Sequence, residues 1–190
     1  DWNLEHDLLD SSFNSMYQGL YTFAGAPKDK QALLLTQRAP REGEAAEIPV
    51  PEELTAEQQD IYRRALSAED YFLLWGPPGT GKTSMMLKHL VSYLFEETEE
   101  NILLLAYTNR AVDEICDSIE RIRQDIRAHY FRIGSRYGTA PRFQPQLLNE
   151  KISKASTRKE LLQVIHRHRI VVGTVSSVSG RTELLKLKQF

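Results

Sequence analysis

The sequence predicts an α/β fold in which a parallel β-sheet is flanked by helices and preceded by a helical N-terminal segment. From about residue 54 onward, short apolar runs that suit buried strands alternate with longer stretches of helical periodicity. A glycine-rich turn joins the first apolar run to the helix that follows it. Because consecutive parallel strands need a crossover helix between them, this alternation favours a parallel sheet.

Two helices and a linker are expected before this core. In residues 4–23, apolar side chains recur at spacings of three and four, which is typical of an amphipathic helix, and a second helix is expected from about Asp29 to Gln37. Residues 38–53 contain three prolines and five glutamates, which indicates a linker. The chain is therefore divided into a helical segment at 1–37, a linker at 38–53 and a core at 54–190.

The core is expected to begin with a helix from Leu54 to Leu66. Thr55 suits its N-cap, and Gln58 follows three residues later, which is the spacing of a capping box. The further elements predicted are a buried strand Tyr71–Trp75, a turn Gly76–Gly81, a helix Lys82–Phe95, a strand Ile102–Ala106, a helix Arg110–Arg127, a short strand Tyr130–Ile133, a loop insertion at 134–155, a helix Thr157–His168 and a strand Ile170–Val172.

The composition is that of a globular protein. Hydrophobic residues make up 41% of the 190 residues and charged residues 26%, which excludes wholesale disorder. The longest apolar runs fall far short of the roughly 20 residues that cross a membrane, so no membrane contact is expected. The first residues are acidic, unlike a signal peptide, and there is no initial Met. We therefore expect the chain to be part of a longer protein.

Cysteine and histidine usage limits the chemistry that the chain can perform. Cys116 is the single cysteine, which excludes an internal disulfide and fits a reducing compartment, so a cytoplasmic location is expected. Cys116 lies in an apolar helical pattern and is interpreted as a packed residue, not a nucleophile. Five scattered histidines and one cysteine do not form a zinc pattern.

The small net charge of −2 hides an asymmetry along the chain. Residues 1–120 hold 9 Lys and Arg against 22 Asp and Glu, whereas residues 121–190 hold 15 against 4. A basic C-terminal third is either a surface that faces phosphate or a solvated face, and charge alone leaves both open.

The clearest chemical signal is the segment Gly76-Pro-Pro-Gly-Thr-Gly-Lys-Thr83, which fits the phosphate-loop pattern. Its glycines allow backbone N–H groups to turn toward phosphate oxygens, and Lys82 supplies a positive charge. The hydroxyl of Thr83 is placed to bind Mg²⁺, so ATP with Mg²⁺ is the expected cofactor and Lys82 and Thr83 are the expected catalytic residues. The predicted contacts in this segment are Gly76, Pro77, Pro78, Gly79, Thr80, Gly81, Lys82, Thr83 and Ser84.

A glutamine upstream of this loop is a candidate for contacting the base. The side-chain amide of Gln58 can pair with both N6 and N7 of adenine. A plain surface glutamine on a helix is the alternative, and Gln59 is the neighbour most easily confused with Gln58.

Three segments together resemble superfamily-1 helicases. They are Leu54-Thr-Ala-Glu-Gln58, the phosphate loop, and Ala106-Tyr-Thr-Asn-Arg-Ala-Val-Asp113. The branch that they resemble holds the nonsense-mediated-decay RNA helicase and the Okazaki-fragment nuclease-helicase. Arg132-Ile-Gly-Ser135 and Val172-Gly-Thr-Val-Ser-Ser177 are similar to two further motifs of that branch, so the resemblance covers about residues 54–180.

This resemblance implies a RecA-like ATP-binding domain that acts on single-stranded DNA or RNA together with a second RecA-like domain. It implies that Gln58 holds adenine and that Thr108 and Asn109 lie on the backbone of the nucleic acid at a helix N-terminus. From the residues alone, Asn109 can cap that helix, and its free N–H groups then either face a phosphate or belong to a plain N-cap without a ligand. The residues that it assigns to the nucleic acid are Thr108, Asn109, Arg132, Thr174, Ser176 and Ser177. Arg136 lies beside this motif and is a further candidate for phosphate contact.

The sequence departs from the family in lacking an acidic pair after a buried strand, where the magnesium site requires one. Asp113 and Glu114 lie inside a predicted helix and do not qualify. The resemblance places the acidic pair and the arginine finger beyond this chain. We therefore expect the front part of a first motor domain, truncated before its Walker B strand, that binds ATP and hydrolyses it poorly. The segment 1–37 is a candidate remnant of an accessory or stalk region.

Three alternatives use the same phosphate loop. An AAA+ remodelling ATPase often carries it, but its acidic pair usually follows much sooner. A small-molecule kinase would need an arginine-rich lid, for which residues 134–155 are a weak candidate. A nucleotide-gated interaction module would bind ATP without performing catalysis.

Overall fold

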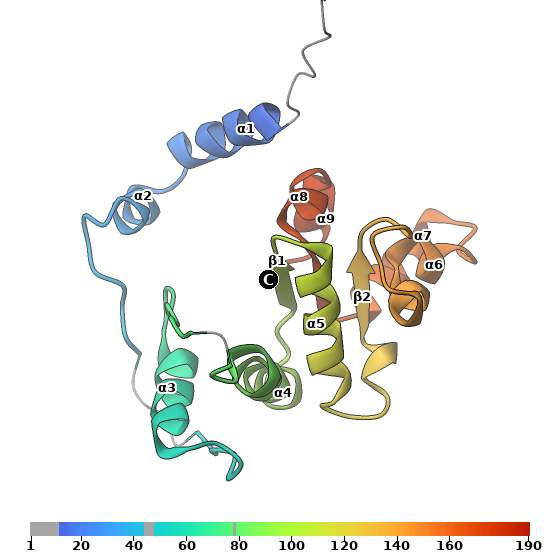
Figure 1. Cartoon of the computed structure of the whole chain (residues 1–190). Helices are drawn as coiled ribbons and strands as arrows, with labels where there is room; N and C mark the ends of the chain where they lie inside the picture. Colours follow the sequence, from blue (N-terminus) through green and yellow to red (C-terminus); the bar gives the residue numbers. More distant parts are fainter. Residues whose placement is uncertain (1–11, 44–47, 78) are drawn as a thin grey trace, which may run out of the picture. The chain divides into compact units, whose positions relative to one another are not determined.

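The computed structural model describes residues 12–43, 48–77 and 79–190 (Figure 1). The chain forms two compact units, Asp1–Pro40 and Arg41–Phe190. In the described residues, no helix is long and apolar enough to cross a membrane.

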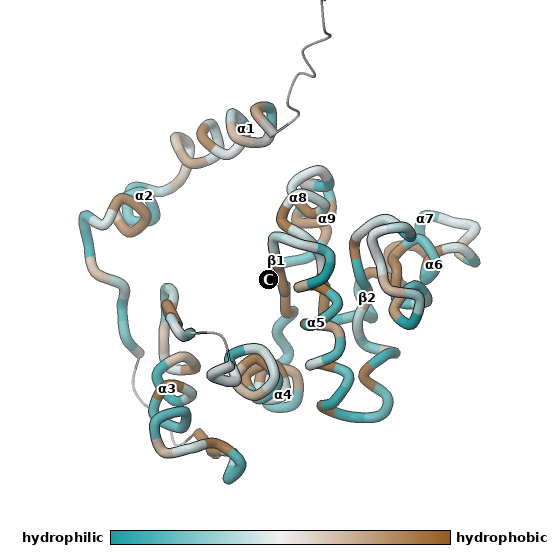
Figure 2. The backbone as a smooth tube through the Cα atoms, viewed as in Figure 1, coloured by the Kyte–Doolittle hydropathy of each residue, from teal (hydrophilic) through white to brown (hydrophobic). Residues whose placement is uncertain are grey.

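The first unit contains the two expected helices, α1 (Ser12–Ala24) and α2 (Lys28–Leu34). The predicted start of the first helix, at residues 4–11, lies outside the described residues. The amide of Gln31 donates hydrogen bonds to the carbonyl oxygens of Phe23, Ala24 and Ala26, which fixes the turn between the helices. Apolar and polar residues alternate along α1 (Figure 2), and most of its large apolar residues are exposed, whereas Phe23 is half-buried.

Three parallel strands form the sheet of the second unit, which confirms the predicted α/β class. They are β1 (Ile102–Ala106), β2 (Tyr130–Ile133) and β3 (Ile170–Thr174), in the order β1-β3-β2. Ala106 pairs with Thr174 in the register of β1 and β3, so these two strands end side by side. The segments that follow β1 and β3 therefore begin next to each other at the same edge of the sheet.

Helices cover both faces of this sheet. Side chains alternate between the faces of a strand, so Ile170 and Val172 pack on one side and Val171 on the other. The first side carries α4 (Lys88–Glu97) and α5 (Asn109–Glu120). The second side carries α6 (Leu148–Ile152), α7 (Arg158–Arg167), α8 (Val175–Ser179) and α9 (Thr182–Leu187). This arrangement is visible in Figure 1.

A smaller cluster holds α3 (Ala56–Ser67). Tyr62 of α3 and the preceding Leu54 are buried with Met86. Met86 lies in η1 (Lys82–Leu87), a π-helical segment that continues directly into α4. The predicted helix Lys82–Phe95 is therefore present, with its first turns wound more loosely than in an α-helix.

Several predicted boundaries differ from the structure, among them the end of the second helix at Leu34 instead of Gln37 and the end of β3 at Thr174 instead of Val172. Helix α5 ends at Glu120 instead of Arg127, and a short turn, η2 (Ile126–Ala128), leads into β2. The expected loop insertion contains η3 (Pro141–Gln146) as well as α6. Phe143 in η3 is fully buried in the core, so this segment is part of the packed domain. Its prolines interrupt the helical periodicity that would otherwise have indicated it.

The predicted buried strand Tyr71–Trp75 is wrong. The segment is not part of the sheet in the described structure, and the side chains of Leu73 and Trp75 are 82% and 89% exposed. A strand needs a hydrogen-bonded neighbour, and β1 at this end of the sheet pairs only with β3 among the described strands. Apolar composition alone therefore overestimated both the burial and the pairing of this segment.

Candidate nucleotide and nucleic-acid sites

The phosphate loop has the backbone conformation that its glycines permit. Gly79 and Gly81 have φ values of +85° and +78°, in the left-handed region that favours glycine. The second of these residues immediately precedes η1. Pro78, one of the predicted contacts, lies outside the described residues.

Lys82 is folded back over the loop. Its ammonium group donates hydrogen bonds to the carbonyl oxygen of Gly76 and, at 2.8 Å, to that of Pro77. The hydroxyl of Thr80 also donates to the Pro77 oxygen, at 2.9 Å. Hydrogen bonds between two charged groups are stronger than those to neutral carbonyls, so a phosphate would compete well for this ammonium.

The structure places Gln58 against the same loop. Thr55 and Gln58 form the predicted capping box, in which Oγ1 of Thr55 accepts from the backbone N–H of Gln58 and Oε1 of Gln58 accepts from that of Thr55. Nε2 of Gln58 donates to the carbonyl oxygen of Thr80 at 3.4 Å. Gln59 instead donates to the carbonyl oxygen of Leu54. Only the first of these glutamines is therefore bonded to the phosphate loop.

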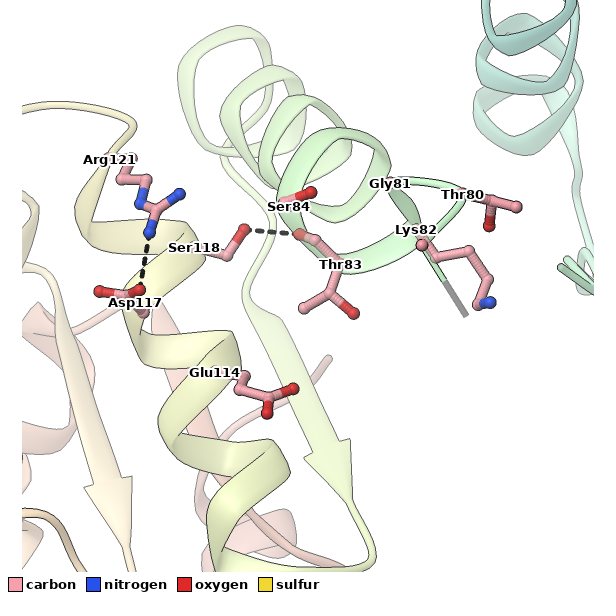
Figure 3. Close-up of a pocket in the computed structure, with 10 residues that line it drawn as sticks. Thr80, Gly81, Lys82, Thr83, Ser84, Glu114, Asp117, Ser118 and Arg121 are labelled. Atoms are coloured by element: carbon pink, nitrogen blue, oxygen red, sulfur yellow. Dashed lines mark hydrogen bonds and ion pairs between the residues drawn. The ribbon is translucent and has the colours of Figure 1, made fainter. Parts of the chain in front are cut away.

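A pocket of about 460 Å³ lies between the loop and α5 and is lined by residues of both (Figure 3). Ser118 of α5 is buried, and its hydroxyl donates to the carbonyl oxygen of Thr83 at 2.6 Å. Arg121 pairs with Asp117 at 2.8 Å on the same helix. The pocket is lined by Gly79, Thr80, Gly81, Lys82, Thr83, Ser84, Glu114, Asp117, Ser118 and Arg121.

Sequence reasoning missed the contribution of α5 to this pocket. Glu114, Asp117, Ser118 and Arg121 recur at spacings of three and four, so they share one face of the helix. These polar residues form one side of an amphipathic helix, and their spacing is the sequence signal that could have indicated a polar pocket beside α5. Its contact with the loop is not visible in the sequence, because residues far apart in the chain make it.

The pocket fits a magnesium ion that arrives with a nucleotide better than an ion held by protein alone. No group of three or more His, Cys, Asp or Glu side chains within the described residues suits a metal. Thr83 and Glu114 do line the same pocket. Mg²⁺ commonly takes only one or two protein ligands and completes its shell with water and phosphate oxygens.

The second group of predicted residues lies where β1 and β3 end. Thr108 precedes α5, and its Oγ1 accepts a hydrogen bond from the backbone N–H of Ala111 at 3.1 Å. The cap expected at Asn109 is therefore supplied by Thr108. Asn109 is the first helical residue, and it is exposed.

Thr174 plays the same part at the end of β3. It is 7% exposed, and its Oγ1 accepts from the backbone N–H of Ser177 at 3.1 Å, which caps α8. A hydrogen bond of 2.7 Å joins the hydroxyls of Thr174 and Ser177. Ser176 is exposed. Ser176 is thus the most accessible of these three predicted contacts, and Thr174 is mainly a cap.

Arg132 does not lie where a nucleic acid could reach it. Its side chain is fully buried and pairs with Asp113 of α5. Nη2 also donates to the carbonyl oxygen of Gly138 at 3.0 Å and to that of Asn109 at 3.4 Å. The prediction that Arg132 contacts phosphate is therefore wrong, because its charge is neutralised inside the protein. It instead ties β2 to the start of α5.

The two groups of residues meet different parts of α5. Ser118 contacts the phosphate loop, whereas Thr108 and Asn109 stand at the other end of the helix. At about 1.5 Å of rise per residue, roughly 13 Å of helix separates Asn109 from Ser118. One rigid helix therefore links the two candidate sites.

Burial shields Cys116 from solvent and favours its protonated form. The residue is fully buried in α5, as the sequence predicted, and burial raises the pKa of its thiol to about 12. A thiol that stays protonated is a poor nucleophile.

Comparison with known proteins finds a matching family model and relatives that are helicases. The family model described as AAA domain matches residues 53–163. The chain is 28% identical over 167 residues to the DNA replication ATP-dependent helicase/nuclease DNA2 of Saccharomyces cerevisiae, which covers 84% of this chain and 10% of that protein. It is 32% identical over 123 residues to the same enzyme of Xenopus laevis, covering 64% of this chain and 11% of the relative.

A further relative comes from the other arm of the branch that the motifs resemble. Regulator of nonsense transcripts 1 of Caenorhabditis elegans is 32% identical over 106 residues, which is 56% of this chain and 9% of that protein. These matches confirm the resemblance to this helicase branch, at modest identity. The chain spans about a tenth of the length of the relatives it matches.

Proposed function

The chain belongs to the AAA domain family, and on this premise we propose that it forms the ATP-binding portion of an ATP-dependent helicase or translocase acting on single-stranded DNA or RNA. The observation that carries the proposal is the phosphate loop, in which two left-handed glycines precede Lys82 and Thr83. The contact of Gln58 with this loop supports the assignment, because it brings an amide suited to adenine beside the residues suited to phosphate.

Each residue of the loop has a defined task in this proposal. Lys82 exchanges the carbonyl oxygens of Gly76 and Pro77 for phosphate oxygens, and the backbone N–H groups after Gly79 surround the same anion. Gln58 gives up its bond to Thr80 and turns to the base. Thr83 offers its hydroxyl to Mg²⁺, which neutralises phosphate charge when it is bound.

The residues at the ends of β1 and β3 are proposed to hold the nucleic acid. Asn109 and Ser176 are exposed at neighbouring strand ends, and Thr108 and Ser177 lie beside them. Hydroxyl, amide and backbone N–H groups at helix starts bind the sugar-phosphate backbone without reading bases. The binding should therefore weaken as salt concentration rises.

We further propose that the rest of the motor, including a second RecA-like domain, completes the catalytic site. β3 continues from Gly173 and Thr174 into α8, and no carboxylate follows it there to position a metal. Transition-state charge stabilisation is the main source of catalysis in phosphoryl transfer. On this basis the chain by itself binds ATP and hydrolyses it slowly. The helicase relatives favour this proposal over an AAA+ remodelling ATPase.

ATP binding by the chain, measured by titration calorimetry with Mg²⁺ present, tests the nucleotide site. We expect Lys82→Ala to weaken ATP binding by about 100-fold or more, because charge-assisted contacts to phosphate contribute several kcal/mol. Lys88→Ala is the matched control, since Lys88 lies six residues later and pairs with Glu53 outside the pocket. Equal affinity of the Lys82 variant and the native chain would overturn the assignment.

A further inference from the structure

The loop that follows β2 presents an aromatic side chain entirely to solvent. Tyr137 is 103% exposed, whereas the nearby Tyr130, Phe131 and Phe143 are completely buried. An aromatic ring in water contributes nothing to the hydrophobic core. Exposed aromatic residues on ordered loops commonly serve as anchors for a ligand.

The backbone on both sides of Tyr137 is held by hydrogen bonds. Oγ of Ser135 accepts from the backbone N–H of Gly138 at 3.1 Å, and Oγ1 of the buried Thr139 donates to the carbonyl oxygen of Ser135 at 2.8 Å. Nε2 of Gln144 donates to the carbonyl oxygen of Arg136 at 3.2 Å. The loop is thus organised before any ligand binds, which lowers the entropy lost on binding.

This loop lies directly against the start of α5. Arg132 donates to the carbonyl oxygens of both Gly138 and Asn109, so one buried guanidinium holds the two segments together. The approach is close, since a Cβ atom built on Gly138 would lie 2.6 Å from Nδ2 of Asn109. Tyr137 directly precedes Gly138 in the sequence, and Gly138 lies against Asn109, where we place the nucleic acid.

The surroundings of Tyr137 suit a nucleotide. An open pocket of about 420 Å³ is lined by Arg136, Tyr137, Thr139, Pro141 and Gln144. The Arg136 guanidinium is exposed and makes a long ion pair of 3.4 Å with Glu150, which a phosphate could replace. Aromatic residues interleaved with cations are the usual means of binding single strands without sequence preference.

We propose that Tyr137 stacks on a base of the single strand whose backbone contacts Asn109, and that Arg136 contacts an adjoining phosphate. This inference rests on the proposed function, because it adds a second contact for the same single-stranded nucleic acid, next to the N-terminus of α5. The ligand is a single-stranded nucleic acid, recognised at this point by the face of a base. Double-stranded nucleic acid does not offer that face to an exposed tyrosine.

The test measures binding of the full chain to a fluorescent single-stranded oligonucleotide by anisotropy at low salt. Tyr137→Ala should weaken binding by about 5- to 100-fold, the range for loss of one stacked base, while Tyr137→Phe retains the native affinity. Tyr21→Ala is the control, since Tyr21 is also exposed, at 84%, but lies on α1. Thermal melts confirm that the variants fold.

An oligonucleotide with abasic positions separates stacking from a general loss of structure. Removing bases should weaken binding to the native chain, and it should have a smaller effect on Tyr137→Ala, which has already lost the stacked contact. Native affinity of Tyr137→Ala, or an undiminished effect of base removal on it, would overturn the inference. If Asn109→Ala weakens binding and Tyr137→Ala does not, the inference alone fails. If the native chain binds no single strand, both proposals fail.

Discussion

The phosphate loop and the start of α5 are the two segments that we propose to bind anions, and the protein holds them in place differently. The phosphate loop depends on local features, namely the left-handed Gly79 and Gly81 and the bonds that converge on Pro77. The segment before it, Tyr71–Trp75, is mostly exposed and pairs with no strand of the described sheet. The start of α5, in contrast, follows a paired strand and is clamped by the buried Arg132.

This difference explains why the phosphate loop can be interpreted from its own residues, whereas the start of α5 was assigned only through the resemblance to a family. Local conformational requirements leave a local pattern, such as glycines at fixed positions before Lys82. Support from distant parts of the chain leaves no pattern of that kind. The same difference predicts different outcomes for mutations. Changes in the phosphate loop should weaken ATP binding, whereas changes at Arg132 should lower the free energy of unfolding.

The largest effect on stability should come from removing the clamp. Arg132→Met leaves Asp113 without this partner and removes the hydrogen bonds that the guanidinium donates to the carbonyl oxygens of Gly138 and Asn109. Because breaking a buried ion pair commonly costs about 3–5 kcal/mol and Asp113 keeps some contact with water, we expect a loss of about 3 kcal/mol. Urea unfolding of the native and variant chains measures it.

Arg132→Lys provides the matched comparison for this clamp. Lysine keeps the positive charge but lacks the planar fork that reaches two segments at once, so its stability should fall between the native and Met variants. A native-like unfolding midpoint for Arg132→Met would show that the clamp does not support α5.

A smaller effect should follow from separating α5 and the phosphate loop. Ser118→Ala removes the hydroxyl that donates to the Thr83 carbonyl oxygen. We expect a loss of about 1 kcal/mol in unfolding free energy, typical of one hydrogen bond, together with weaker ATP binding. Ser92→Ala on α4 is the control, because Ser92 bonds only to Glu96 on the same helix. ATP affinity equal to that of the control would contradict a role for Ser118 in positioning the loop.

The smallest effect should be a pH dependence that arises on the far side of the sheet. Burial lowers the pKa of His168, and the nearby Lys151, Arg167 and Lys188 act in the same direction. The hydrogen bond of 2.6 Å between Nδ1 of His168 and the carbonyl oxygen of Val164 raises the pKa and is outweighed. The unfolded chain therefore binds a proton more readily than the folded one. Stability should be fully present above about pH 6.5 and should decline as the pH falls below it.

Unfolding by urea at pH 7.5 and at pH 5.5 checks this expectation. His168→Gln should show a smaller difference between the two conditions, although His89, whose pKa is also lowered by burial, keeps part of it. ATP binding should not follow this change, because His168 packs against Phe131 on the face of the sheet opposite α4 and α5. An unchanged pH dependence in the variant would show that His168 is not its source.

The sequence predicted those features that depend on residues close together in the chain. The capping box of Thr55 and Gln58 is confirmed, as are the strands at 102–106 and 130–133 and the packed Cys116. Each of these leaves a periodic or fixed-spacing pattern.

Predictions failed where the answer depends on distant partners. Tyr71–Trp75 is apolar enough for a buried strand but has no neighbour to pair with in the described structure. Arg132 has the charge to bind phosphate but meets Asp113, which lies 19 positions earlier in the sequence. Ser118 gave no signal on its own, since its partner Thr83 is 35 positions away.

We have proposed that this chain is part of a motor that ATP drives along single-stranded nucleic acid. The most direct test of this proposal is the steady-state ATPase rate of the full-length protein with and without single-stranded DNA and RNA. We expect one of the two nucleic acids to stimulate hydrolysis strongly, and Asn109→Ala to reduce that stimulation while the basal rate is kept. A rate indifferent to both nucleic acids would contradict the account and favour a remodelling ATPase.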